Sequence, residues 1–447
     1  MLTLRPPHGA PVAATTFVAA VNPALAVGSA TLAGTTNDPA LLLEEVAFTA
    51  YYPADLSQRP RPRKGLDWLL RPVGTALRGL SRFAGVPSWL LWPVVFLFGT
   101  ALKIPVYRNA PLLSPGNEKQ WSLVIFSHGL GGSRTAYSQL CTEMAAAGKV
   151  VLAIEHRDGT APACTFGSRT VLYYRDEDVV FPVEDQSEPR VLPLRADQLV
   201  FRQHEVYRTY ATFCKLVREG VVLEALDGAE EGLRSWLPAA TDGPALVNCD
   251  DVALVGHSFG GCTALSVLSS APPSSAYEAL PISKVVLYDP WLEPLPSPGP
   301  TPATSFSEPS TTAAGTRPES VLKPDSRPPE QMLVINSQVF SLWKDHFTRL
   351  VGVVDAWQPN GRRLLTLVGS QHHSFSDFPV LPLIRTKSAS KLIDLAATLS
   401  LAFLDDTLDA ALERVPTKPM EERIIGKRKD GRPKRTLVGE VGDVIVH

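Results

Sequence analysis

One short stretch, Val252 to Leu265, constrains the fold of this chain more than any other. It reads VALVGHSFGGCTAL: an apolar run typical of a buried strand, a glycine-rich turn, and residues that favour a helix. The turn places Ser258 between Gly256 and Gly260. A serine at such a point can simply cap the helix that follows. The spacing instead favours a strand-to-helix turn so tight that glycine is needed on either side and the serine hydroxyl stands above the sheet.

Short apolar runs that end in small or polar residues recur along the chain, and helix-length segments separate them. Buried parallel strands have this pattern, and their carboxyl ends carry functional residues. The alternation predicts an α/β fold with a mostly parallel, doubly wound sheet and helices on both faces. Combined with the Gly-x-Ser-x-Gly turn, it resembles the α/β-hydrolases. The runs are 44–54, 122–129, 149–157, 251–258, 284–291, 331–337 and 364–373.

Changes in composition suggest how the chain is organised. Residues 1–40 are rich in Ala, Thr, Pro and Gly, and we expect a loosely ordered leader. Residues 41–412 should form a single α/β-hydrolase domain with two inserts. The first insert, 58–105, is basic and then strongly apolar; the second, 292–330, is rich in Pro, Ser and Thr, and its composition predicts disorder. Residues 413–447 are expected to form a basic tail.

The basic tail contains the run GKRKDGRPKR, from Gly426 to Arg435. Such a run is found in nuclear signals and in patches that face lipid, but a solvated charged surface is the commoner case. We therefore expect this segment to be a solvated tail.

Overall charge and cysteine content exclude some classes of protein. A net charge of −2 gives no reason to expect nucleic acid as a partner of the whole chain. The five cysteines lack metal-ligand spacing, which predicts reduced thiols in a cytoplasmic protein. Near the start, Arg5 is followed by two prolines, and Asn22-Pro23 interrupts the later apolar run. We therefore expect no signal peptide.

A serine nucleophile needs a base to take its proton, and in α/β-hydrolases the acid and the histidine follow the serine in chain order. Asp289 ends the apolar run VVLYDPW, so its carboxylate is expected at the edge of the sheet that carries Ser258. The segment GSQHHSF supplies two candidate bases, His372 and His373, which point apart. Residues that fit these roles less well are Asp345, Asp355, Asp377, His346 and His447.

Hydrolysis of an ester also needs backbone N–H groups that stabilise the oxyanion of the transition state. The residue after the nucleophile, Phe259, should supply one of them. The early loop SHGLGGSR should supply the other from Leu130, which follows His128 and Gly129. Adjacent histidines rarely share one ion, and no Cys/His/Asp set has metal spacing, so we expect neither a metal nor another cofactor.

Several motifs occur in the order seen in one family. They are FSHGLGGSRTAYS, AIEHRDGTAPA, GHSFGG, YDPW, INS and HHSFSDF, with SWLLWPVVFLFGTALKIP before them and LIDLAATLSLAFL after them. In these segments, over roughly residues 44–412, the chain resembles the calcium-independent platelet-activating-factor acetylhydrolases, the group with the plasma and type II intracellular enzymes. EHRDG is much less generic than Gly-x-Ser-x-Gly, and it gives the resemblance most of its weight.

The resemblance implies a nucleophile at Ser258, an acid at Asp289 and a base at His372. His372 is preferred to His373 because Phe375 and Asp377 then keep the family's spacing. The implied reaction releases an acetyl, short or oxidised acyl group from the sn-2 position of a phospholipid and leaves a lysophospholipid, without calcium. The proline-rich insert and the basic tail are extra to the family pattern.

The apolar half of the first insert raises the question of membrane contact. Phe83 to Leu102 contains no charged residue, but Pro87 and Pro93 interrupt it. Just before it, Arg71, Arg78 and Arg82 are spaced to share one face of a helix. We favour a basic amphipathic helix that lies on a membrane or lipoprotein-like surface, over core packing and over a true span. The side chains expected to enter the surface are Trp89, Leu90, Leu91 and Trp92.

Two other functions stay open at this point. The same catalytic residues would serve a generic carboxylesterase, lipase or cutinase-like enzyme acting on small esters. A non-catalytic interaction module with a hydrolase fold would not need a complete triad. The expected partner is a phospholipid at a membrane surface, and the expected location is cytoplasmic with peripheral membrane association; the sequence leaves the oligomeric state open.

Overall fold

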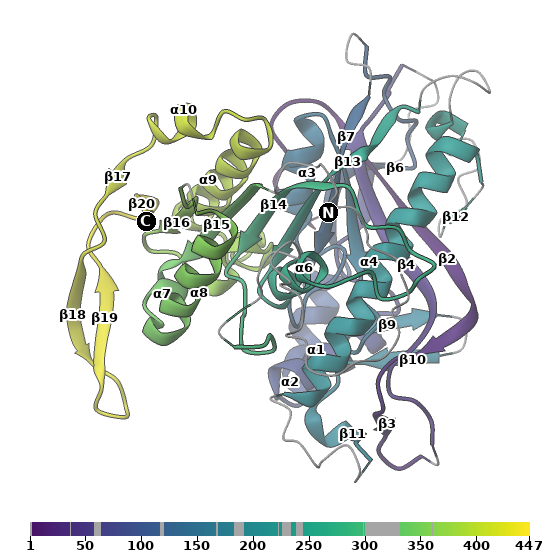
Figure 1. Cartoon of the computed structure of the whole chain (residues 1–447), viewed down its shortest axis with the longest axis horizontal. Coiled ribbons are helices and arrows are strands. Elements are labelled where there is room, and N and C mark those ends of the chain that lie inside the picture. Colours follow the sequence, from purple (N-terminus) through teal and green to yellow (C-terminus); the bar gives the residue numbers. More distant parts are fainter. Residues whose placement is uncertain are drawn as a thin grey trace, which may run out of the picture.

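A large twisted β-sheet with helices on both faces forms the body of the protein (Figure 1). The computed structural model describes residues 2–35, 37–57, 64–116, 120–166, 169–182, 192–221, 223–225, 234–237, 245–297, 299, 331–359 and 361–447. The sheet order is β1-β6-β2-β4-β8-β7-β13-β14-β15-β16-β20-β17.

Six neighbouring strands in the middle of the sheet run parallel. Each begins and ends within a few residues of an apolar run in the sequence, because buried parallel strands need side chains that can be covered on both faces. The prediction of a mostly parallel sheet is therefore confirmed. These strands are β8 (Lys149–Glu155), β7 (Trp121–Ser127), β13 (Val247–His257), β14 (Ile282–Tyr288), β15 (Gln331–Ser337) and β16 (Leu364–Leu367).

The amino-terminal side of the sheet shows that the expected loosely ordered leader was wrong. Strand β2 (Val12–Ala26) lies antiparallel to β4 (Leu42–Pro53), and β4 lies antiparallel to β8. Phe17 on β2 is fully buried, and its ring lies 5.4 Å from that of Phe48 on β4. The long β2–β4 ladder overrides the low strand propensity of an alanine-rich segment. Shorter strands here are β1 (Leu2–Thr3), β5 (Lys64–Asp67), β6 (Leu102–Arg108) and β12 (Glu224–Ala225).

The expected basic tail is also structured, so the hydrolase domain does not end at residue 412. Strand β20 (Val444–Val446) pairs antiparallel with β16, and β17 (Thr417–Lys418) pairs with β20. Between them, β18 (Glu422–Lys427) and β19 (Pro433–Leu437) form a separate hairpin. Other small sheets pair β9 (Ala163–Phe166) with β10 (Arg169–Leu172), and β3 (Thr31–Leu32) with β11 (Val179–Val180).

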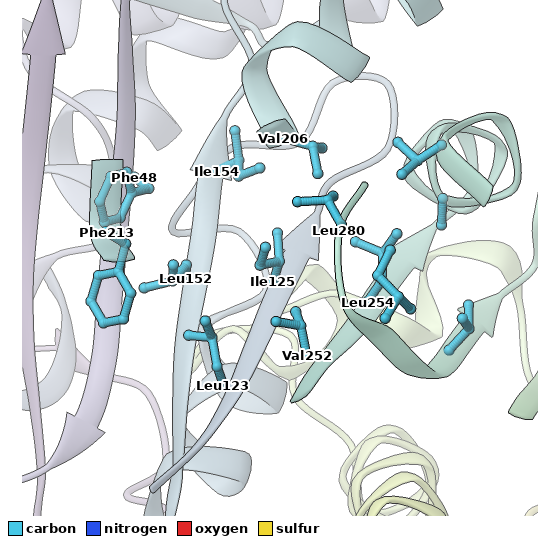
Figure 2. Close-up of a cluster of buried hydrophobic side chains, with 14 of the residues drawn as sticks. Phe48, Leu123, Ile125, Leu152, Ile154, Val206, Phe213, Val252, Leu254 and Leu280 are labelled. Atoms are coloured by element: carbon cyan, nitrogen blue, oxygen red, sulfur yellow. The ribbon is translucent and has the colours of Figure 1, made fainter. Parts of the chain in front are cut away.

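Two apolar cores cover the two faces of the sheet. Along β7, Leu123 and Ile125 contribute to one core, and the alternating residues Val124 and Phe126 contribute to the other. Figure 2 shows part of the first core, where Leu123, Ile125 and Val206 point toward the same layer. Helices α4 (Pro193–Glu219), α6 (Phe259–Ser269) and α8 (Lys344–Trp357) supply the first core, and α3 (Ser138–Ala146) and α9 (Lys387–Leu404) the second.

The insert between β5 and β6 consists of short helices. None of the helices in the described part of the chain is both long and apolar enough to cross a membrane. The prediction that three arginines share one face of a helix was wrong. Arg71 precedes the helix and pairs with Asp67, and Arg82 pairs with Asp178. The insert contains α1 (Val73–Ala84), α2 (Ser88–Val94) and the π-helical turn η1 (Val95–Gly99).

The remaining helical segments are short. They are α7 (Gln338–Ser341), α10 (Leu408–Leu412), η2 (Asp176–Asp178), η4 (Arg234–Trp236), η6 (His372–Phe375) and η7 (Phe378–Val380). Three of them, α7, η6 and η7, follow the carboxyl ends of β15 and β16. Of the insert 292–330 expected to be disordered, 298 and 300–330 lie outside the described residues. The described residues Leu292 and Leu295 are buried in the first core.

Candidate active site

Ser258 occupies the junction of β13 and α6 in a strained backbone conformation. Its φ is 57° and its ψ is −118°, a region that residues with a Cβ rarely adopt. The two flanking glycines explain why the turn can close. A Cβ on Gly256 would lie 2.3 Å from the carbonyl oxygen of Gly260, and a Cβ on Gly260 would lie 2.0 Å from that of Ser127. The local sequence therefore builds the expected elbow and holds Ser258 at the carboxyl end of the central strand.

His372 and Asp289 complete a hydrogen-bonded chain with this serine. Nε2 of His372 lies 2.9 Å from Oγ of Ser258, and Nδ1 lies 2.9 Å from Oδ2 of Asp289. The carboxylate can only accept when ionised, so Nδ1 carries the proton of a neutral imidazole and Nε2 accepts from the serine hydroxyl. Asp289 is fully buried, and its loop follows β14, next to β13 in the sheet. Three residues from three separate loops thus meet at one edge of the sheet.

The other candidate acids and bases lie elsewhere. His373 is exposed, whereas the neighbouring His372 faces the serine. His346 lies in α8, where its Nε2 accepts from the Leu292 amide, and burial lowers its pKa to about 4. Asp355 pairs with Arg362. His447 contacts Thr366 through Nε2, and Asp345 lies in the first turn of α8.

Asp377 has a structural role that was not apparent from its position in the sequence. It is fully buried and accepts hydrogen bonds from the Trp68 indole, the Ser138 amide and hydroxyl, and the Gln139 amide. Burial raises its pKa above the ordinary range, and the four donors oppose that shift. Asp377 therefore ties the loop of His372 to the start of α3.

A second hydrogen-bonded chain links the histidine loop to the early glycine loop. Nε2 of His257 donates to the carbonyl oxygen of His372 at 2.9 Å. Burial holds the pKa of His257 well below its ordinary value, so its Nδ1 accepts from the Tyr137 hydroxyl at 2.8 Å. That hydroxyl in turn accepts from the Gly129 amide at 3.3 Å. The residue before the nucleophile therefore positions both flanking loops.

The loop that follows β7 lies directly against the nucleophile. A Cβ on Gly129 would lie 2.9 Å from Cβ of Ser258. The next amide, that of Leu130, has no hydrogen-bond acceptor within the described part of the chain. Phe259 is the first residue of α6, and the first amides of a helix have no partner in the helix. Both amides expected to form the oxyanion hole are thus left available beside Ser258.

The motif EHRDG, Glu155 to Gly159, helps to hold the loop that follows β7. Asp158 accepts from Nε of Arg202 at 2.8 Å, and neither side chain is exposed. The same guanidinium donates to the carbonyl oxygen of His128 at 2.7 Å, and it lies 4.6 Å from the ring centre of Phe259. Arg202 therefore contacts both segments that carry the expected oxyanion donors. Burial and the nearby Arg202 lower the pKa of His128 to about 3.

Comparison with known proteins agrees with this geometry. The family model for platelet-activating factor acetylhydrolase, isoform II, matches residues 13–300. The chain belongs to this family. The match begins within β2, in the segment that sequence analysis had assigned to a leader. The predicted resemblance to the platelet-activating factor acetylhydrolases is therefore confirmed.

Two curated members of the platelet-activating factor acetylhydrolases give the scale of the similarity. The bovine (Bos taurus) platelet-activating factor acetylhydrolase is 26% identical over 374 residues, which cover 81% of this chain and 70% of that protein. The dog (Canis lupus familiaris) platelet-activating factor acetylhydrolase is 27% identical over 356 residues, covering 76% and 68%. Among solved structures, a ferulic acid esterase from Streptomyces cinnamoneus matches with a TM-score of 0.51 and 15% identity, covering 92% of this chain and 94% of that one. This likeness supports the α/β-hydrolase fold.

One group of side chains in this acetylhydrolase-family site could in principle hold a metal ion. The ligand atoms of His257, Asp289 and His372 lie within 4.8 Å of one another. Each of these groups already serves in a hydrogen bond to Tyr137, Ser258, Ser337 or another member of the group. A metal would have to replace those bonds. A reaction without metal or other cofactor stays a prediction.

Two further neighbours of the triad were not predicted from the sequence. Ser337 donates to Asp289 through its amide at 2.6 Å and its hydroxyl at 2.5 Å. The ring of Phe340 stacks on that of His372, with centres 4.4 Å apart and planes 4° apart. Ser337 ends a predicted strand, so its position was a usable signal; nothing in the sequence marked Phe340.

The side chains expected to enter a membrane all lie on α2. Trp89 is 75% exposed, and Leu90 and Trp92 are also exposed, whereas Leu91 is half-buried. We define the apolar patch as these three exposed residues and their exposed neighbours on α2, η1 and the loop after η7. The neighbours are Val94, Phe96, Leu97, Phe98, Leu383 and Ile384. A wholly apolar hollow of about 270 Å³ lies between the two parts of the patch.

Proposed function

We propose that this protein hydrolyses the sn-2 acetyl, short or oxidised acyl ester of phospholipids like platelet-activating factor, and that Ser258, His372 and Asp289 form its catalytic triad. The observation that carries the proposal is the continuous chain from Oγ of Ser258 through His372 to Asp289, with both distances at 2.9 Å. The names of the related acetylhydrolases indicate the substrate class. The products are a lysophospholipid and a carboxylate.

The geometry supports an acyl-enzyme mechanism. Oγ of Ser258 attacks the ester carbonyl carbon while Nε2 of His372 takes the hydroxyl proton. The amides of Phe259 and Leu130 stabilise the oxyanion, and the imidazolium returns the proton to the leaving lysophospholipid oxygen. Water then attacks the acyl group on Ser258, again with His372 as base, and releases the carboxylate. Asp289, held by both donors of Ser337, keeps Nδ1 of His372 protonated throughout.

We propose that the enzyme reaches its substrate through the apolar patch, as a peripheral protein at a lipid surface. Exposed tryptophan and leucine side chains on a short surface helix are typical of such interfacial segments. Each large side chain that becomes fully buried contributes about 1.5–3 kcal/mol. Replacing Trp89, Leu90 and Trp92 with serine should therefore weaken sedimentation with phosphatidylcholine vesicles by orders of magnitude. Hydrolysis of a soluble acetyl ester should change little, since the triad lies on other elements. A folded variant that loses both vesicle binding and ester hydrolysis contradicts this part of the proposal.

The cytoplasmic location belongs to the same proposal. All five cysteines are free and buried, in keeping with a reducing compartment. Fractionation of the cells that make the protein would test the assignment.

A panel of phosphatidylcholines with sn-2 chains from acetyl to palmitoyl, assayed with EDTA present, tests the substrate class. We expect turnover to be highest for acetyl and other short chains and to survive the chelator, because backbone amides stabilise the oxyanion in place of a cation. A preference for long chains, or a strict need for added calcium, contradicts the proposal. Equal turnover of small non-lipid esters and short-chain phospholipids would instead indicate a generic carboxylesterase.

A further inference from the structure

The β18–β19 hairpin concentrates positive charge at one end of the molecule. From Glu421 to Arg435 there are seven lysine and arginine residues and three carboxylates, a net charge of +4, whereas the whole chain carries −2. In Figure 1 the hairpin extends away from the sheet beside β20, and its turn is the part most distant from the sheet. The charge therefore lies on a projection of the surface.

Most of this charge is exposed and unopposed. Every residue from Arg423 to Lys434 is exposed. Arg435 pairs with Glu422, and Arg432 lies 3.8 Å from Asp430. For the other five basic residues, no carboxylate of the described chain lies within ion-pair distance; these are Arg423, Lys427, Arg428, Lys429 and Lys434. Ile424 and Ile425 on the same strand are 60% and 50% exposed, so the hairpin also offers apolar side chains.

The hairpin is a formed element that fixes these charges in space. The Gly431 amide donates to the carbonyl oxygen of Arg428, and Gly431 has the positive φ of 79° that its turn requires. At the other end, Leu437 is buried against Val368 and Ile445. Lysines on edge strands commonly serve only to prevent pairing between sheets. Here Lys427, Arg428 and Lys429 gather at the turn, where there is little edge to protect.

The root of the hairpin is connected to the active-site loops. Oγ1 of Thr436 on β19 accepts from Nε2 of Gln338 at 3.1 Å. Gln338 directly follows Ser337, whose hydroxyl donates to Asp289. The side-chain oxygen of Gln338 also accepts from the Gly369 amide, in the loop that leads to His372. The hairpin thus emerges at the edge of the sheet where Ser258, His372 and Asp289 meet.

We propose that the β18–β19 hairpin is a docking surface for an anionic phospholipid membrane. Its basic turn attracts the charged headgroups, and its isoleucines contact the interface. The location of its root brings the active-site edge toward the bilayer. The exposed Ile424 and Ile425 beside these charges favour lipid over nucleic acid as the anionic partner, because a membrane interface can bury apolar side chains. The benefit of docking rests on the proposed function, but the binding itself needs no hydrolysis.

Vesicle sedimentation with the full-length Ser258→Ala variant tests this proposal without turnover of the lipid. We expect tighter binding to vesicles of phosphatidylcholine with phosphatidylglycerol than to phosphatidylcholine alone, and a decrease of that preference with added salt. Each basic residue near an anionic surface strengthens binding about fivefold. Replacing Lys427, Arg428 and Lys429 together with serine should therefore weaken binding to the anionic vesicles about 100-fold.

A matched variant removes three exposed basic residues away from the hairpin, Lys215, Arg218 and Arg362, and should keep most of the anionic preference. Equal losses in the two triple variants, or no loss in the hairpin variant, overturn the proposal. Tighter hairpin-dependent binding to duplex DNA than to the anionic vesicles also overturns it and identifies a nucleic-acid surface. With Ser258 intact, the hairpin variant should hydrolyse a soluble acetyl ester normally, so failure of the proposed function is seen separately.

Discussion

Gly260→Ala is the sharpest perturbation of the elbow, because the added methyl group has no space. Its Cβ would lie 2.0 Å from the carbonyl oxygen of Ser127 and 3.0 Å from the carbonyl carbon of His128. Both are backbone atoms of the loop that carries the expected oxyanion donor. Restoring a normal non-bonded separation needs a shift of about 1.5 Å. Overpacking of this kind costs about 1–3 kcal/mol of stability, and a displacement of about 1 Å can lower activity about 100-fold.

Gly352→Ala is the matched control, since Gly352 lies in α8 with no atom within 4 Å of the added Cβ. Alanine in that helix should stabilise the fold by about 0.5–1 kcal/mol. Urea unfolding and hydrolysis of a soluble acetyl ester would be measured for both variants. We expect Gly260→Ala to lose stability and at least about 100-fold in kcat/KM, and Gly352→Ala to lose neither. Normal stability and activity in Gly260→Ala would refute the account of the elbow.

Four further predictions concern the triad, its support and pH. In the soluble-ester assay His372→Ala should be inactive and His373→Ala near normal, and the reverse result would shift the assignment by one residue. Asp289→Asn should be slow but active, because it disturbs the orientation of His372 rather than removing the base; full activity would argue against an acid there. Arg202→Met should cost about 3–5 kcal/mol in urea unfolding by leaving buried Asp158 without its partner, and a second change, Asp158→Leu, should recover part of the loss; no loss in the single variant would count against the buried pair. Burial lowers the pKa of His346 to about 4, whereas its pKa in the unfolded chain is about 6.5. Between these two values only the unfolded chain binds the proton, so the stability present above pH 6.5 is lost as the pH falls toward 4. The decline in unfolding free energy over this window should be shallower in His346→Gln, and an identical decline would contradict the assignment.

The central strands could be predicted from sequence because burial on both faces leaves little choice of residue. The runs around Leu254 and Val286 are apolar throughout, and each lies in a parallel strand of the sheet. The leader could not be recognised as β2, since its frequent alanines weaken the strand pattern of the Val, Thr and Phe residues between them. What stabilises β2 is its long pairing with β4, and a contact between distant segments leaves no local signal.

The carboxyl-terminal hairpin was missed for a different reason. The sequence carries the pair Asp430-Gly431, and a short glycine-containing segment of this kind is typical of the loop of a hairpin. The surrounding run of positive charge favoured a solvated tail and outweighed that sign. Composition therefore misled where turn chemistry was informative.

The candidate site was predictable where it depends on strand ends. Ser258 and Asp289 each follow a recognisable strand, and parallel strands bring their carboxyl ends to one edge. The choice between His372 and His373 depends on the path of a loop, and only the family spacing indicated it before the structure. Arg202 gave no signal, because a charged residue in a helix is normally exposed and its burial depends on the distant Asp158.

Labelling with a fluorophosphonate tests the central claim most directly, because the reagent reacts with a serine only when a neighbouring base activates it. Wild-type protein, Ser258→Ala and His372→Ala would each be treated, digested and analysed by mass spectrometry. The account predicts a single labelled serine, Ser258, in the wild type, and no label in Ser258→Ala or at that position in His372→Ala. Label on another serine, or equal labelling of Ser258 with and without His372, would contradict it.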